Sequence, residues 1–117
     1  QLKNRYNELL NDLPVIIPYQ SPESYSSIHL YPIKINFEIV DKTRKDIFDE
    51  LRANKIGVNV HYIPIHLQPY YLKFGFKPGD FPESEAFYAN VITLPLFYSM
   101  SFKDQDLVVN NLKNILN

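Results

Sequence analysis

Nine prolines divide this chain of 117 residues into short segments and place most of its turns. Proline fixes its own φ angle and lacks a backbone N–H, so it ends helices and in sheets favours edges and the starts of strands. Only three glycines accompany these prolines. None of the three fits a glycine-rich phosphate loop, which argues against a dinucleotide or nucleoside triphosphate site on this chain alone.

Size and composition indicate one folded domain. Hydrophobic residues make up 45% and charged residues 21% of the chain, the usual balance of a globular protein. The net charge is −1 and the chain has no cluster of Lys and Arg. A nucleic-acid-binding surface needs such a cluster, so nucleic acid is not an expected partner. No apolar run approaches the roughly 18 residues that span a bilayer, and the first residues do not show the basic-plus-apolar pattern of a signal peptide, so no membrane partner is expected. Cysteine is absent, which excludes disulfides and thiolate metal sites.

The hydrophobic pattern changes its period along the first third of the chain. Apolar residues spaced by three and four predict a helix from Leu2 to Leu13, which Pro14 ends. From Ile28 the pattern has period two and predicts a half-buried strand. Its inward residues are Tyr31, Ile33, Ile35 and Phe37.

The central segments follow the same alternation. Asp41 or Thr43 is expected to cap a second helix, with Ile56-Gly57 as its stop. We expect a short strand over 57–62, a proline-broken aromatic loop over 63–81, a third helix that begins at Pro82, and a strand over 91–96. The buried stripe of the second helix is predicted to be Ile47, Phe48 and Leu51.

The last helix has the clearest start, because Ser101 and Asp104 have the spacing of a capping box. Its predicted buried stripe is Leu107, Val108, Leu112 and Ile115. The order of elements predicts an α+β fold, an α/β sandwich in which helices cover one face of a small, largely antiparallel sheet. We expect the other face, with Asn59, His61 and Lys34, to be open and to dock on a larger partner.

Residues 59–71 contain the densest group of side chains suited to ligand binding. Two histidines and three tyrosines follow the end of a predicted strand there. Tyrosine rings can stack on sugars or bases, and their hydroxyls can form hydrogen bonds with the same ligand. His61 and His66 could equally be partly buried structural histidines, and Tyr70-Tyr71 could be core or interface. Pro64 prevents helical His-x4-His geometry and no third ligand is evident, so no metal site is predicted. His29, before the first strand, is open to either interpretation.

The segment from Gly57 to Tyr71 resembles the C-terminal signature of the DegT/DnrJ/EryC1/StrS sugar aminotransferases. The resemblance covers nearly the whole chain. Within the family, residues 61–71 and 77–82 are most similar to the 4-aminotransferases of pseudaminic acid biosynthesis, which make UDP-4-amino-4,6-dideoxy-N-acetyl-β-L-altrosamine. Further similar segments are 5–10, 27–31, 75–76, 79–82, 86–88, 92–96 and 101–104.

This resemblance implies a cytoplasmic, homodimeric enzyme of fold type I that uses pyridoxal 5'-phosphate (PLP). The enzyme would transfer an amino group from glutamate to a UDP-4-keto-6-deoxyhexose in surface polysaccharide biosynthesis. Residues 1–117, which begin with Gln1 inside a helical pattern, would be its small C-terminal domain. The catalytic lysine and most cofactor contacts would lie in a large domain outside this chain, so the chain alone would be inactive.

The resemblance also assigns candidate substrate-binding residues on this chain and no catalytic residue. These candidates are His61, Tyr62, Ile63 and Pro64, followed by Asn59, His66, Tyr70 and His29. A stand-alone carbohydrate-binding or protein-interaction module with an aromatic loop is the alternative.

Overall fold

In the computed structural model, which describes residues 1–117, three antiparallel strands form one small sheet in the order β1-β2-β3. The strands are β1 (Val15–Ile16), β2 (Tyr31–Ile35) and β3 (Val91–Leu94). In the register, Ile33 lies opposite Ile92, and Val15 lies opposite Ile35. The predicted α+β class with a small antiparallel sheet is confirmed.

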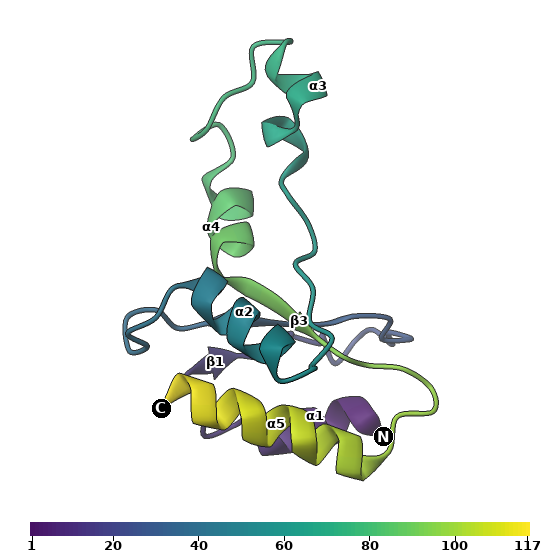
Figure 1. Ribbon diagram of the computed structural model, residues 1–117. Coiled ribbons are helices and arrows are strands. Elements are labelled where there is room, and N and C mark those ends of the chain that lie inside the picture. The colour runs from purple at the N-terminus through teal and green to yellow at the C-terminus, as the bar shows by residue number, and fades with distance from the viewer.

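Three helices, α1 (Leu2–Leu9), α2 (Arg44–Ala53) and α5 (Phe102–Leu116), pack against the sheet. Figure 1 shows α1 and α5 side by side below the strands, with α2 beside β3. The alternation in β2 buries Tyr31, Ile33 and Ile35 and leaves Pro32 and Lys34 half-buried, as the period-two pattern predicts. No helix has both the length and the apolar character needed to cross a membrane.

Residues 61–90, called the arm below, leave this domain and return to β3 (Figure 1). The arm contains a 3-10 turn, η1 (Ile65–Leu67), and the helices α3 (Pro69–Leu72) and α4 (Pro82–Asn90). Pro82 begins α4 as predicted. None of the 18 residues of the hydrophobic core belongs to the arm. Its exposed apolar side chains are Tyr62, Ile63, Ile65, Tyr70, Tyr71, Leu72, Phe74, Phe76, Phe81 and Phe87.

The strand predicted over 57–62 is wrong. Only Asn59 pairs with β3, through an isolated antiparallel bridge to Thr93. A longer antiparallel ladder would run from Thr93 toward Val91, but the chain turns into the arm after this bridge. The first predicted strand is also too long, because Phe37 lies in a turn at the edge of the core.

The second face of the sheet is less open than predicted. Val91 is 0% and Thr93 4% exposed, and both alternate with the core-facing residues of β3. The ring of His61 lies against Thr93 through a hydrogen bond between His61 Nδ1 and Thr93 Oγ1. This part of the face is therefore covered by the chain itself, while Lys34 on the neighbouring strand remains half-buried.

Both predicted helix caps are present, and the choice between two candidates for the cap of α2 is resolved. Thr43, and not Asp41, caps α2, and its hydroxyl accepts the Asp46 N–H. Ser101 and Asp104 form the box of α5. The predicted stripe of α5 is wrong at Leu107, which is 56% exposed. The helix is rotated so that the buried side chains, at spacings of three and four, are Gln105, Val108, Val109, Leu112, Ile115 and Leu116.

Candidate functional site

Residues 59–64, called the site segment below, run from the bridge to β3 into the first four residues of the arm and contain most of the candidate binding residues. Asn59 exchanges two backbone hydrogen bonds with Thr93, with N···O distances of 3.2 and 2.8 Å. The Asn59 Oδ1 atom accepts the Val60 N–H at 2.9 Å. His61 Nδ1 lies 3.0 Å from Thr93 Oγ1. One strand residue, Thr93, therefore holds the start of the site segment through backbone and side chain.

Tyr62 and Ile63 follow this attachment and point away from packed surroundings. Tyr62 is 70% and Ile63 50% exposed, whereas Pro64 is buried. The ring of His61 meets Tyr62 edge-on, with centroids 4.6 Å apart. The site segment thus combines a fixed backbone with an exposed ring, an exposed hydroxyl and an exposed aliphatic side chain, groups that suit a neutral, hydroxyl-rich ligand.

His66 lies in the interior of the arm and is only 6% exposed. Its Nε2 atom is 2.8 Å from Glu85 Oε1, and its ring packs on Phe81 at 4.8 Å. Both Glu85 oxygens accept the Gly79 N–H, at 2.8 and 3.0 Å. The hydrogen bond from His66, followed by that from Gly79, lowers the pKa of Glu85 below its usual value. Burial and pairing favour the interpretation of His66 as a structural histidine.

Tyr70 and His29 lie apart from the site segment. Tyr70 is in α3 at the outer end of the arm, where Lys73 lies over its ring at 4.0 Å (Figure 1). His29 is exposed in a hollow of about 590 Å³ beside α1, together with Tyr25 and Tyr98. The structure brings Asn59, His61, Tyr62, Ile63 and Pro64 together and leaves the other three candidates at separate places.

Glu85 is the residue that sequence reasoning missed. Its position in the first turn of α4 gives an acid near a helix N-terminus, a common stabilising arrangement that does not indicate a partner. Its partner His66 is 19 residues away, and only the return of the arm brings the two side chains together.

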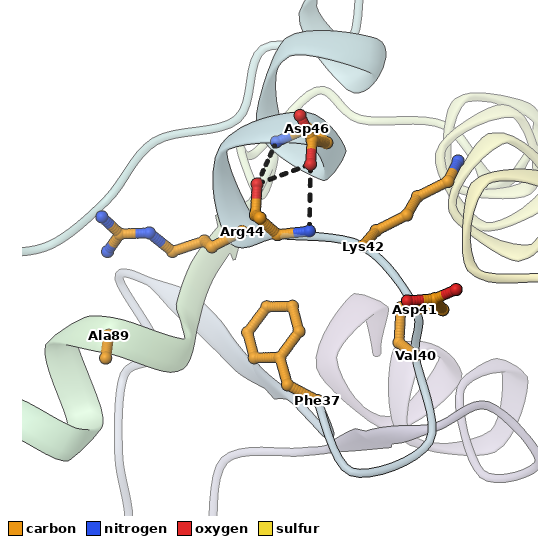
Figure 2. A pocket seen from close by; sticks show the side chains of 8 residues that line it. Phe37, Val40, Asp41, Lys42, Arg44, Asp46 and Ala89 are labelled. Carbon is orange, nitrogen blue, oxygen red and sulfur yellow. Dashed lines mark hydrogen bonds between the residues drawn. The ribbon is translucent and has the colours of Figure 1, made fainter.

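A second hollow, of about 590 Å³, lies between the start of α2 and the end of α4 (Figure 2). Figure 2 shows the ring of Phe37 facing it and the bonded capping box at its rim. The cations at its edge are engaged within the protein. Lys42 pairs with Glu50, and Arg44 stacks on Tyr88 and donates to its carbonyl. This hollow offers no unpaired cation to a ligand.

The residues of this chain do not form a PLP site. A lysine that holds this cofactor is enclosed, and its phosphate needs a cradle of free N–H groups. No lysine of the chain is buried, and the Gly79 N–H is bound to Glu85. No three His, Asp or Glu side chains are grouped so that they could hold a metal ion. Any cofactor chemistry therefore needs residues beyond these.

In a comparison with known protein families, residues 1–113 match the DegT/DnrJ/EryC1/StrS aminotransferase family. The uncharacterised protein MJ1066 of Methanocaldococcus jannaschii is 40% identical over 95% of the chain and 29% of its own length. The spore coat polysaccharide biosynthesis protein SpsC of Bacillus subtilis is 33% identical over 99% of the chain and 31% of its own length.

Among solved structures, the chain is similar to Spr1654, a candidate sugar aminotransferase of Streptococcus pneumoniae. In the PMP form of that protein the TM-score is 0.87 at 30% identity, over 96% of the chain and 28% of Spr1654. Spr1654 is also known in a PLP form, which agrees with the cofactor that the sequence resemblance implies. The chain spans less than a third of the length of each of these proteins.

Proposed function

The chain belongs to the DegT/DnrJ/EryC1/StrS aminotransferase family, and from this premise we propose that it is the small domain of a PLP-dependent nucleotide-sugar aminotransferase. In this proposal the site segment forms one wall of the sugar-nucleotide site. The remaining two-thirds of the enzyme would contribute the catalytic lysine and the cofactor contacts.

One observation supports the role of the site segment more than any other. Tyr62 and Ile63 are exposed although the residues on both sides are fixed, His61 to Thr93 on one side and the buried Pro64 on the other. Exposed aromatic and aliphatic side chains on a fixed backbone lose little conformational freedom when they bind a ligand. A tyrosine hydroxyl and ring provide the neutral hydrogen bond and stacking surface that a sugar requires.

PLP, when bound, supplies the electron sink that amino-group transfer requires. The residues described here act on the sugar nucleotide. Tyr62 would contact and orient the sugar, Ile63 would exclude water from one side of it, and His61, held by Thr93, would keep both in place. In this proposal these residues bind and orient the substrate, and proton transfer is left to the lysine of the large domain.

The finer assignments are part of the same proposal. Glutamate is the amino donor, a UDP-4-keto-6-deoxyhexose is the acceptor, and the enzyme is a homodimer. Similarity of residues 61–71 and 77–82 to the pseudaminic acid enzymes supports C4 amination in that type of pathway. The cytoplasmic location stays a prediction.

Replacement of Tyr62 in the full-length enzyme tests this function. We expect Tyr62→Ala to raise the KM for the sugar nucleotide about fivefold, since loss of one neutral hydrogen bond costs ~1 kcal/mol, with kcat nearly unchanged. The glutamate half-reaction needs no sugar and should keep its rate. Stopped-flow absorbance of the cofactor measures both half-reactions. Tyr62→Phe separates the hydroxyl from the ring.

Tyr19→Ala is the matched control, because Tyr19 is 86% exposed and lies outside the arm. It should leave both half-reactions unchanged. Unchanged kinetics in Tyr62→Ala would remove the site segment from the substrate site. Equal loss of both half-reactions, or loss of PLP, would assign the segment to the fold or the cofactor instead.

A further inference from the structure

We infer that Glu85 is a positioning residue that holds the site segment from its far end, through His66. The consequence for substrate rests on the function proposed above. The role of Glu85 in positioning the segment follows from contacts within this chain.

The site segment and the two residues after it are held at two points by one continuous piece of structure. At the first point, Thr93 of β3 bonds to Asn59 and His61. At the second point, Glu85 of α4 bonds to His66. Helix α4 ends at Asn90 and β3 begins at Val91, so both points belong to a single helix–strand unit. Tyr62 and Ile63 lie between the two points.

Glu85 joins three parts of the arm at the second point. Glu85 itself belongs to α4. Its carboxylate accepts the N–H of Gly79, in the turn before α4, and is hydrogen-bonded to His66 in η1. The side chain of Glu85 is 24% exposed and that of His66 is 7% exposed, so water has limited access to the pair. The lowered pKa of Glu85 agrees with a carboxylate that remains ionised in these contacts.

The hydrophobic core does not replace these contacts. Because none of the 18 core residues lies in the arm, core packing does not fix the path from His61 to Glu85. The stacking of Arg44 on Tyr88 and its hydrogen bond to the Tyr88 carbonyl also attach α4 to the domain, but they hold only the base of the arm. Loss of the Glu85 carboxylate should therefore loosen the arm while the domain keeps its stability.

Amide hydrogen exchange of the full-length enzyme tests this inference. In Glu85→Ala we expect exchange at Leu67 and Gln68, whose amides donate to the Pro64 and Ile65 carbonyls beside His66, and at Gly79 to accelerate about tenfold, the change that corresponds to a lost charge-assisted hydrogen bond. Amides of Ile33 and Ile92 in the core should be unaffected. The KM for the sugar nucleotide should rise about tenfold, with the glutamate half-reaction unchanged.

Two further variants make the result specific. Glu85→Gln keeps one side-chain oxygen, which can accept from both His66 and Gly79 as Glu85 Oε1 does, so it should restore most of the protection. Glu83→Ala removes an exposed acid from the same turn of α4 and should change nothing.

Unchanged exchange in Glu85→Ala would overturn the inference whatever the kinetics showed, and so would equal acceleration in the arm and the core. Faster exchange in the arm with an unchanged KM would support the role of Glu85 and contradict the substrate role of the site segment. The inference and the proposed function therefore fail in different ways.

Discussion

At the scale of single residues, tyrosine has two opposite roles in this chain. Tyr6 and Tyr31 are fully buried, with ring centroids 4.8 Å apart. Their hydroxyls remain satisfied, because Tyr6 donates to the Pro95 carbonyl at 2.9 Å and Tyr31 donates to Asn7 Oδ1 at 2.6 Å. Tyr62, in contrast, presents its ring to solvent. Hydrophobic periodicity distinguishes the two roles, since Tyr6 and Tyr31 occupy inward positions. Tyr62 comes three residues after Asn59, the only residue of 57–62 that pairs with β3.

The two buried tyrosines predict that the domain loses stability in alkali. Burial raises the pKa of both Tyr6 and Tyr31 well above the usual value of about 10. At a pH between the pKa of these tyrosines in the unfolded state and their higher pKa in the folded state, only the unfolded state loses the hydroxyl protons. The free energy of unfolding is therefore fully maintained below about pH 10 and falls as the pH rises above it.

Thermal unfolding followed by circular dichroism between about pH 8 and 11 measures this loss. Tyr31→Phe removes one of the two buried hydroxyls, so the melting temperature of this variant should decline less steeply with pH. Tyr19→Phe, at an exposed position, should keep the slope of the native protein. The same slope in all three proteins would show that titration of the Tyr31 hydroxyl does not contribute to the loss of stability.

At the scale of elements, the ends of α2 show how far local rules extend. Its start follows them, with Thr43 and Asp46 in a capping box. Its end contradicts the expected stop at Gly57, because Lys55 adopts the left-handed conformation at φ 62°. The Ile56 N–H bonds to the Leu51 carbonyl at 2.9 Å and the Lys55 N–H to the Arg52 carbonyl at 3.0 Å. These two bonds form a Schellman motif, with Lys55 in the position where glycine is usual.

Glycine at position 55 should therefore stabilise the domain. A side chain in the left-handed region costs ~1–2 kcal/mol, and glycine avoids this strain. Part of the gain is offset because glycine has more conformational freedom in the unfolded state. We expect Lys55→Gly to raise the free energy of unfolding by about 0.5–1 kcal/mol in urea titration. Lys55→Ala keeps a Cβ at the strained position and is the control, with little expected change. Equal stabilisation by both variants would assign the effect to the lost lysine charge.

At the scale of the whole molecule, the chain consists of a packed domain and an arm that depends on few contacts. The domain has the 18-residue core, whereas the arm exposes a series of aromatic side chains from Tyr62 to Phe87 (Figure 1). Contiguous exposed apolar surface of several hundred Å² is typical of sites that other surfaces cover. This distribution agrees with a domain that works within a longer enzyme.

We predict that the arm is covered in the full-length protein. Amide exchange over residues 61–81 should be slower in the full-length enzyme than in the 117-residue chain, because contact with the rest of the enzyme suppresses local opening. Amides of β2 serve as the internal control and should exchange at similar rates in both. Equal exchange of the arm in both proteins would favour the alternative of an independent binding module.

Much of this protein was predictable from the sequence, because the relevant interactions join residues close together in the chain. Period-two alternation identified the buried side of β2, and the capping-box spacing identified the start of α5. For α2 the sequence narrowed the cap to Asp41 or Thr43. Pro82 marked the start of α4. The similarity of residues 57–71 to a family signature identified the family, which the match over residues 1–113 confirms.

Tertiary structure alone decided the features that depend on distant partners. The bridge between Asn59 and Thr93 replaced the expected strand, and the rotation of α5 left Leu107 exposed. The pairing of His66 with Glu85 had no local signal, because hydrophobic periodicity and capping describe only the nearest turns of the chain. The return path of the arm sets these contacts. That path therefore determines which histidine is enclosed and which tyrosine faces the proposed site.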